Sequence, residues 1–302
     1  MNFWFLILIF ECLELYTLNN PIYVTKFSGE KVEFNPSALK NSLIKSGAPL
    51  QQVEYVFNEM KKHIYDGITT RKLYQIAFKL LKQQRNVFAA RYSLKKALRD
   101  LGPAGYYFEK WVAKVFEYYG FQTLTGQLLY GKAVKHEVDV VAQKDERLIL
   151  AECKFRNTVD AKISVTTPMY FLSRIKDLEE KSFNFFGTAM KLTEGWLVSN
   201  AYLTKDAIAF AECYNIGLIS WDYPEDRSIK RRVDQGGLYP ITCLTTISQA
   251  EKELLLQKGC ILVKDIIREN SLIEFLNISH KKAKNILKEA HELTELSSTN
   301  DE

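Results

Sequence analysis

The sequence of 302 residues has few cysteines and no long apolar run. Its five cysteines are widely separated, and no two have the Cys-x-x-Cys spacing of a zinc knuckle or redox pair. This distribution argues against a disulfide framework and fits a reducing compartment. The apolar run Phe3–Phe10 is much shorter than the roughly 20 residues that a membrane-spanning helix needs. We therefore expect a cytoplasmic protein with no stable membrane partner.

The sequence also lacks the glycine-rich motifs of common nucleotide enzymes. Neither GxGxxG nor GxxxxGK[ST] occurs, so a Rossmann or P-loop enzyme is unsupported. The content of 47% hydrophobic and 25% charged residues excludes a mainly disordered chain. The net charge of +5 is unevenly spread, because residues 21–101 hold 15 basic and 6 acidic side chains. Such a basic segment favours a polyanionic partner, either DNA or a nucleoside triphosphate.

The pattern of apolar residues and turn signals divides the chain into four segments. Residues 1–20 are an apolar extension, interpreted as a buried strand, a packed helix or residues added by an upstream start codon, with a membrane or signal role as the alternative. Residues 21–102 predict a short β-hairpin followed by helices. Residues 103–226 alternate helices and strands, and residues 227–302 are mostly helical. We therefore expect a multi-domain α/β protein.

The stretch 129–155 predicts two strands, 129–142 and 148–155, joined by a four-residue loop. In the register that this loop sets, residues whose numbers sum to 291 face each other, so Asp139 lies opposite Glu152. Facing side chains on one side of a sheet have Cβ atoms about 5 Å apart. Two carboxylates at that distance can share one Mg²⁺ ion.

The neighbours of these two carboxylates have expected positions as well. Lys154 shares a face with Glu152, because side chains alternate along a strand, and Glu137 falls opposite Lys154. Val138 is expected on the opposite, packed face, and His136 as a packed or hydrogen-bonded residue rather than a proton shuttle. A metal that activates water, with a lysine beside it, suits phosphodiester hydrolysis. The alternative, which spacing alone favours, is a solvated hairpin face with cross-strand ion pairs.

Asp139 followed by Glu152-Cys153-Lys154 resembles the D…(D/E)xK signature of the restriction-endonuclease-like superfamily, and more narrowly its Mrr-like branch. The predicted helix upstream fits too, because the first core helix of such proteins carries a glutamate, here Glu109, that approaches the metals. The resemblance implies a nuclease core that uses Mg²⁺ or Mn²⁺. In that core Asp139 and Glu152 are metal ligands, the Cys153 carbonyl is a third ligand, and Lys154 is catalytic.

The basic segment resembles an ATP-cone, the nucleotide-sensing module of ribonucleotide reductases and their repressor. The matching pieces, in order along the segment, are Val24-Thr25-Lys26, Phe34-Asn35-Pro36, Gly67-Ile68-Thr69-Thr70 and Ala89-Ala90-Arg91-Tyr92. The resemblance implies ATP or dATP as an effector that Lys26, Thr70 and Arg99 contact. Phe27 and Ala38 stand where the family has basic residues, so weaker binding is expected. The alternative is a degenerate cone that contacts DNA or joins copies of the chain.

The helical tail contains a third resemblance. The sequence around Asn277-Ile278-Ser279 resembles a helix-hairpin-helix, with Asn277 where glycine is usual. Asparagine tolerates the left-handed conformation that such a turn needs. In that motif, hairpin amides and nearby lysines contact phosphates without reading sequence. The alternative is a solvated helix face that carries lysines.

Together these features predict a Mg²⁺-dependent DNA endonuclease of restriction or DNA repair, regulated by ATP or dATP. We expect DNA as the main partner and allow a nucleoside triphosphate and a second copy of the chain as further partners. One alternative is a nucleotide-responsive DNA-binding regulator whose nuclease fold is inactive. Another is a junction resolvase or repair nuclease, which would prefer branched DNA over modified duplex.

Overall fold

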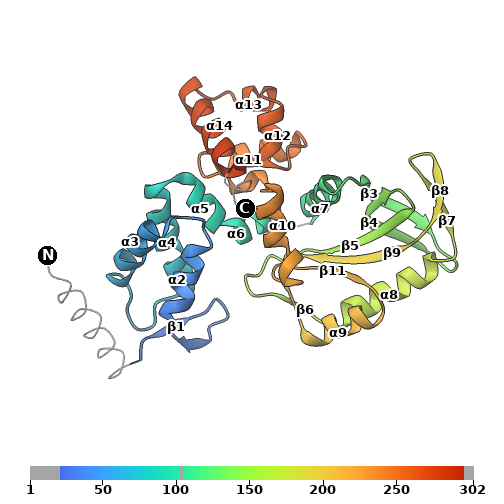
Figure 1. Cartoon of the computed structure of the whole chain (residues 1–302), viewed down its shortest axis with the longest axis horizontal. Helices are drawn as coiled ribbons and strands as arrows, with labels where there is room; N and C mark the ends of the chain where they lie inside the picture. Colours follow the sequence, from blue (N-terminus) through green and yellow to red (C-terminus); the bar gives the residue numbers. More distant parts are fainter. Residues whose placement is uncertain (1–20, 103–104, 296–302) are drawn as a thin grey trace. The chain divides into compact units, whose positions relative to one another are not determined.

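The computed structural model of the protein describes residues 21–102 and 105–295. The chain divides into two compact units, residues 1–92 and 93–302, and each is described by itself (Figure 1). The apolar run expected near the start of the chain lies outside the described residues. No helix among the described residues is both long enough and apolar enough to cross a membrane.

The described part of the first unit, residues 21–92, consists of a β-hairpin followed by four helices. These elements are β1 (Tyr23–Thr25), β2 (Lys31–Glu33), α2 (Pro36–Ile44), α3 (Leu50–Lys61), α4 (Thr70–Gln84) and α5 (Asn86–Tyr92). The hairpin turn contains Gly29 with φ 86°, a left-handed value that glycine adopts without strain. Asn35 caps α2, because its side chain accepts a hydrogen bond of 2.9 Å from the Ala38 N–H. The expected hairpin and helices are therefore confirmed.

The last helical stretch of the basic segment divides at Ser93 into two helices. Its second half, α6 (Leu94–Arg99), belongs to the second unit. There the Thr242 hydroxyl donates a buried hydrogen bond of 2.7 Å to the Ala97 carbonyl. The boundary between the units therefore lies before residue 93, whereas the sequence pattern places the domain boundary after residue 102.

The second unit is built around a five-stranded mixed sheet with the strand order β11-β9-β5-β4-β3. Strands β5, β9 and β11 are parallel, and β3, β4 and β5 are antiparallel. Helices α8 and α9 cover one face and α7 the other (Figure 1). The elements are α7 (Tyr106–Tyr118), β3 (Gln122–Tyr130), β4 (Lys135–Lys144), β5 (Arg147–Lys154), α8 (Thr166–Leu178), β9 (Glu194–Ser199), α9 (Lys205–Cys213) and β11 (Gly217–Ile219).

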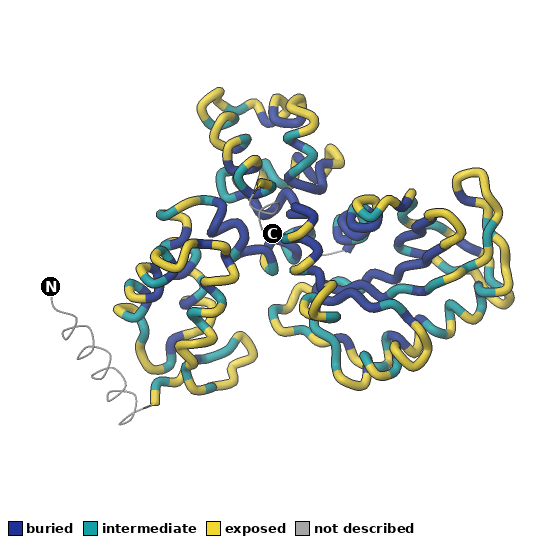
Figure 2. Tube along the Cα trace, viewed as in Figure 1, coloured by how far each residue is buried: buried dark blue, intermediate teal, exposed yellow. Residues whose placement is uncertain are grey.

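Two short strand pairs flank this sheet, β6 (Lys162–Ile163) with β10 (Tyr202–Leu203), and β7 (Ser182–Phe185) with β8 (Thr188–Lys191). The single strand expected over 129–142 is wrong. This span contains the end of β3, a turn in which the Gly131 N–H donates a hydrogen bond of 2.8 Å to the Val134 carbonyl, and most of β4. Figure 2 shows buried backbone along the central strands, as expected for strands covered on both faces.

The C-terminal part of the second unit is helical, as expected. Its elements are η1 (Glu225–Arg227), α10 (Ile229–Gly236), η2 (Ile241–Cys243), α11 (Gln249–Gln257), α12 (Val263–Arg268), α13 (Ser271–Glu274) and α14 (His280–Glu295). Ser248 and Glu251 form a capping box at the start of α11. Asn277, between α13 and α14, has φ 47°, so the left-handed turn that the sequence allowed is present.

Candidate active site

The β4–β5 hairpin follows the expected register and then departs from it at the two acidic residues. Residues 140–144 pair with residues 147–151, and the numbers of each pair sum to 291. The paired residues end at Val140 and Ala151, so Asp139 and Glu152 do not form the expected facing pair. Instead, the Asp139 carboxylate accepts a hydrogen bond of 2.6 Å from the Cys153 N–H. Asp139 thus reaches across to β5 beside Glu152.

The alternation of side chains in β4 changes at this point. Val138 packs in one apolar cluster with Val141 and Leu150, although residues three apart point to opposite faces of a regular strand. The expectation that Val138 lies on the opposite face is therefore wrong. On β3, Gly126 lies opposite Asp139, between two residue pairs of the β3–β4 ladder, and has a left-handed φ of 62°. The break in alternation turns the Asp139 side chain away from its regular direction.

Glu152 is the most buried acid of the site, with 4% of its surface exposed. Its Oε1 accepts from the Lys154 ammonium at 2.5 Å, which confirms that Glu152 and Lys154 share a face. Its Oε2 pairs with the Arg174 guanidinium of α8. Both oxygens of this carboxylate therefore carry a cationic partner. Glu137, expected opposite Lys154, pairs with Leu128 of β3 and is exposed.

Glu109 and Asp139 share one electrostatic environment with Glu152. Burial raises the pKa of the Glu109 carboxyl to about 7, and the nearby charges of Asp139 and Glu137 add to the shift. Burial raises the pKa of Asp139 to about 6, with the Glu152 charge adding and the Cys153 N–H opposing. The structure thus brings Glu109, from the first turn of α7, to the predicted carboxylates and lysine.

The Cys153 side chain lies on the packed side, as expected, with 9% of its surface exposed. Burial raises the pKa of this thiol well above its usual value, so the thiol is neutral. The chemical contribution of Cys153 is therefore its backbone. Its N–H already orients Asp139, and its carbonyl is the atom that the sequence resemblance implies as a ligand.

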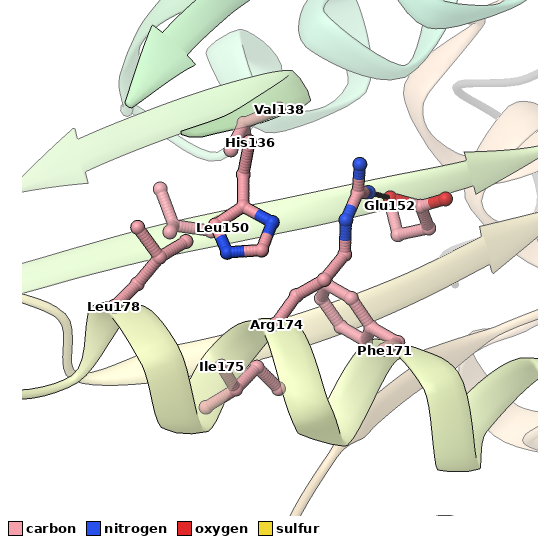
Figure 3. Close-up of a pocket in the computed structure, with 8 residues that line it drawn as sticks. All are labelled: His136, Val138, Leu150, Glu152, Phe171, Arg174, Ile175 and Leu178. Carbon is pink, nitrogen blue, oxygen red and sulfur yellow. Dashed lines mark hydrogen bonds and ion pairs between the residues drawn. The ribbon is translucent and has the colours of Figure 1, made fainter. Parts of the chain in front are cut away.

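Helix α8 supplies two further charged residues that the sequence interpretation missed. Arg174 lies within the apolar stripe of Phe171, Ile175 and Leu178, and together they line a small cavity against the sheet (Figure 3). This position is the sequence signal that could have identified Arg174, because a helical wheel places this charged residue on the buried face of the helix. Its partner Glu152 is 22 residues away in sequence, which no local pattern reveals.

Asp177, one turn after Arg174, fixes the start of β4. Its carboxylate forms a hydrogen bond of 2.7 Å with the His136 Nε2. It also accepts hydrogen bonds from the backbone N–H groups of Ala133 and Val134, at 2.7 and 3.2 Å. These contacts lower the pKa of Asp177, with the His136 hydrogen bond as the largest cause. His136 is therefore a hydrogen-bonded strand residue, as expected. Helix α8 therefore holds β5 through the Arg174–Glu152 ion pair and β4 through the hydrogen bonds of Asp177.

The donor atoms of the site suit a hard divalent cation. Among the described residues, no three histidine, cysteine, aspartate or glutamate side chains form a group that could hold a metal ion. Mg²⁺ commonly binds one or two carboxylates and keeps several waters. Asp139 and Glu152 provide two carboxylates, and the backbone of Cys153 adjoins both. The residues present therefore fit Mg²⁺ or Mn²⁺ without a third acidic ligand.

Two of the three residues that the ATP-cone resemblance implies, Lys26 and Thr70, lie in the first unit. An isolated bridge between Thr25 and Thr69 places Lys26 and Thr70 on adjoining segments of the first unit. Lys26 forms an ion pair of 3.0 Å with Glu30 of the same hairpin. Arg99 lies in α6 of the second unit.

Two protein-family models match separate parts of the second unit. A family model described as a restriction endonuclease matches residues 103–223, and one described as AF1548-like, C-terminal, matches residues 239–294. An uncharacterized protein of Archaeoglobus fulgidus is 32% identical over 181 residues, which are 59% of this chain and 97% of that protein.

A solved structure also matches this chain. The crystal structure of a protein of unknown function, AF1548, matches with a TM-score of 0.51 and 31% identity, over 63% of this chain and 98% of that chain. The first match bears out the expected restriction-endonuclease-like core, and the tail that resembles a helix-hairpin-helix is covered by the AF1548-like match. The chain therefore belongs to the AF1548-like family, with a restriction endonuclease domain followed by an AF1548-like C-terminal domain.

Proposed function

We propose that the second unit is a Mg²⁺-dependent DNA endonuclease that hydrolyses phosphodiester bonds. The observation that carries this proposal is the convergence of Asp139, Glu152 and Lys154 at the point where β4 leaves the β5 ladder. Asp139 and Glu152 would hold the metal, with the Cys153 carbonyl as a further oxygen. A bound Mg²⁺ supplies Lewis-acid stabilisation and an acidified water.

The remaining steps fall to side chains of the chain itself. The Lys154 ammonium, beside Glu152, stabilises negative charge that develops on the scissile phosphate. Glu109, with its pKa raised to about 7 by burial and neighbouring acids, can hold or release a proton near neutral pH. Asp139 is fixed by the Cys153 N–H, so the site requires little reorganisation of β4 and β5.

The test is a cleavage panel of linear, methylated, branched and single-stranded DNA with Mg²⁺, for the wild type and Asp139→Ala. The expected result is cleavage by the wild type and loss of cleavage in the variant, whose folding is checked by circular dichroism. Equal cleavage by both folded proteins would disprove the assignment. A preference for branched DNA would point to a resolvase, and a preference for methylated duplex to restriction. DNA binding without cleavage would favour the regulator with an inactive nuclease fold.

We further propose that the first unit binds ATP or dATP and regulates cleavage. The support is the ordered set of ATP-cone pieces and the proximity of Lys26 and Thr70 through the Thr25–Thr69 bridge. A lysine and a hydroxyl group are suitable partners for a triphosphate. Titration calorimetry with ATP and dATP tests the proposal. No heat and no thermal shift at millimolar nucleotide would remove it.

A further inference from the structure

Arg174 is a charged residue of the candidate site for which the proposed hydrolysis gives no role. Its side chain is 17% exposed and its Nη1 pairs with Glu152 Oε2. The other oxygen, Oε1, pairs with Lys154 at 2.5 Å. Figure 3 shows the Arg174 side chain beside Glu152. A buried carboxylate with two cationic partners, from β5 and from α8, is held in a single orientation.

The contacts of Arg174 are incomplete for a residue that only supports the fold. Its Nε is buried and has no hydrogen-bond partner among the described residues. Beside it lies a cavity of about 10 Å³, lined by apolar side chains of the sheet and α8 and by His136. The ion pair with Glu152 is the charged contact that holds the guanidinium in place. Arg174 therefore directs its one strong contact at Glu152.

The chemistry of Glu152 Oε2 makes this contact competitive. A guanidinium and a hard divalent cation bind the same carboxylate oxygens, and two positive groups close to one oxygen repel each other. The effect is strong here because Glu152 is 4% exposed and little water screens the charges.

We infer that Arg174 is a positioning residue that competes with the divalent cation for Glu152 and so sets the metal concentration at which the site loads. This inference rests on the proposed metal site. When no divalent cation is bound, the ion pair with Arg174 orients Glu152 and offsets its buried charge. A divalent cation must weaken or displace that ion pair in order to bind Oε2. Removal of the guanidinium should therefore tighten metal binding, whereas loss of a merely structural residue should weaken it.

The experiment is a calorimetric titration of the full chain with Mn²⁺. Arg174→Gln is expected to bind Mn²⁺ about tenfold more tightly than the wild type. Lys176→Gln is the matched control, because it removes one positive charge from the exposed side of the same helix. Binding by this control should change less than about twofold, since the charge is screened by water. The Mg²⁺ concentration for half-maximal cleavage should fall by the same factor as the Mn²⁺ dissociation constant.

Two further variants keep the test decisive. In a Glu152→Gln background the additional Arg174→Gln substitution should leave Mn²⁺ affinity unchanged, because the competition is for Glu152. Arg174→Lys keeps the charge but loses the planar fork, so a smaller gain in Mn²⁺ affinity, about threefold, is expected. This variant replaces Arg174→Gln in the test if Arg174→Gln does not fold. Unchanged or weaker Mn²⁺ binding in the folded Arg174 variants would overturn the inference, as would a wild type that binds no Mn²⁺.

The failures of the two proposals are distinguishable. Tighter Mn²⁺ binding by Arg174→Gln, with no DNA cleavage by any protein, supports the competition and contradicts the proposed nuclease. DNA cleavage by the wild type, with no gain in Mn²⁺ affinity in the Arg174 variants, supports the nuclease and contradicts the competition.

Discussion

The two candidate sites of this protein hold their charged groups in different ways. In the second unit, Glu152 is 4% exposed and its cationic partners come from β5 and α8. In the first unit, the Lys26 side chain is 40% exposed, and its partner Glu30, from the same hairpin, is 60% exposed. Buried charges act on one another with little screening, whereas an exposed pair contributes about 0–1 kcal/mol. Substitutions should therefore have large effects at the buried site of the second unit and small effects at the exposed site of the first unit.

The largest effect is expected for Lys154→Met. Loss of the ammonium that stabilises the phosphate should lower the single-turnover rate of DNA cleavage by about 10²- to 10³-fold at saturating Mg²⁺. Lys191→Met, an exposed residue of β8, is the control and should cleave at the wild-type rate. A Lys154→Met protein that cleaves as fast as this control would show that the buried site has no special electrostatic role.

A smaller effect is expected for the pH dependence of stability. The raised pKa of Glu109 means that the fold opposes its ionisation, so stability is lost as pH rises from about 4.5 through about 7. Glu109→Gln removes this loss. Its melting temperature should match the wild type at pH 4.5 and exceed it by about 2–4 °C at pH 8, measured by calorimetry with a chelator present.

The control for this measurement is Glu180→Gln, an exposed glutamate after α8. Its melting temperature relative to the wild type should stay nearly constant with pH, since water screens its charge. A Glu109→Gln protein that behaves in the same way would contradict the burial of Glu109 beside the other carboxylates.

The smallest effect is expected at the exposed site. If Lys26 contacts a triphosphate, Glu30 competes with that contact through the ion pair of 3.0 Å. Glu30→Gln should therefore tighten ATP binding by about threefold, and Lys26→Ala should weaken it by about fivefold, in calorimetric titrations. Opposite signs of these two changes would support the site. Equal ATP binding by all three proteins would exclude Lys26 from it.

Local sequence patterns predicted much of the fold for physical reasons. The short turn between β4 and β5 sets the register of residues 140–144 against 147–151, and the apolar runs mark the buried parallel strands. Asn35 and Ser248 cap their helices because an amide or hydroxyl oxygen accepts a hydrogen bond from a nearby backbone N–H group, a local interaction that sequence patterns can indicate. Strand β3 was missed because eight of its nine residues are exposed or only partly buried and show no clean alternation.

The fine geometry of the candidate site could not be predicted in the same way. The facing pair of Asp139 and Glu152 fails because the β4–β5 pairing ends one residue earlier, and the β3–β4 pairing also skips Asp139. The ion pair of Arg174 with Glu152 and the hydrogen bond of Asp177 with His136 join residues 22 and 41 positions apart. Such contacts arise from the packing of α8 on the sheet, which periodicity alone does not specify.

The central claim is that Asp139 and Glu152 together hold a divalent cation. Calorimetric titration of Mn²⁺ into the wild type and Asp139→Asn tests it most directly, since asparagine keeps an oxygen that can accept the Cys153 N–H hydrogen bond. The account predicts one binding event in the wild type that weakens by at least about tenfold in Asp139→Asn. Equal Mn²⁺ affinity in the two folded proteins would contradict it.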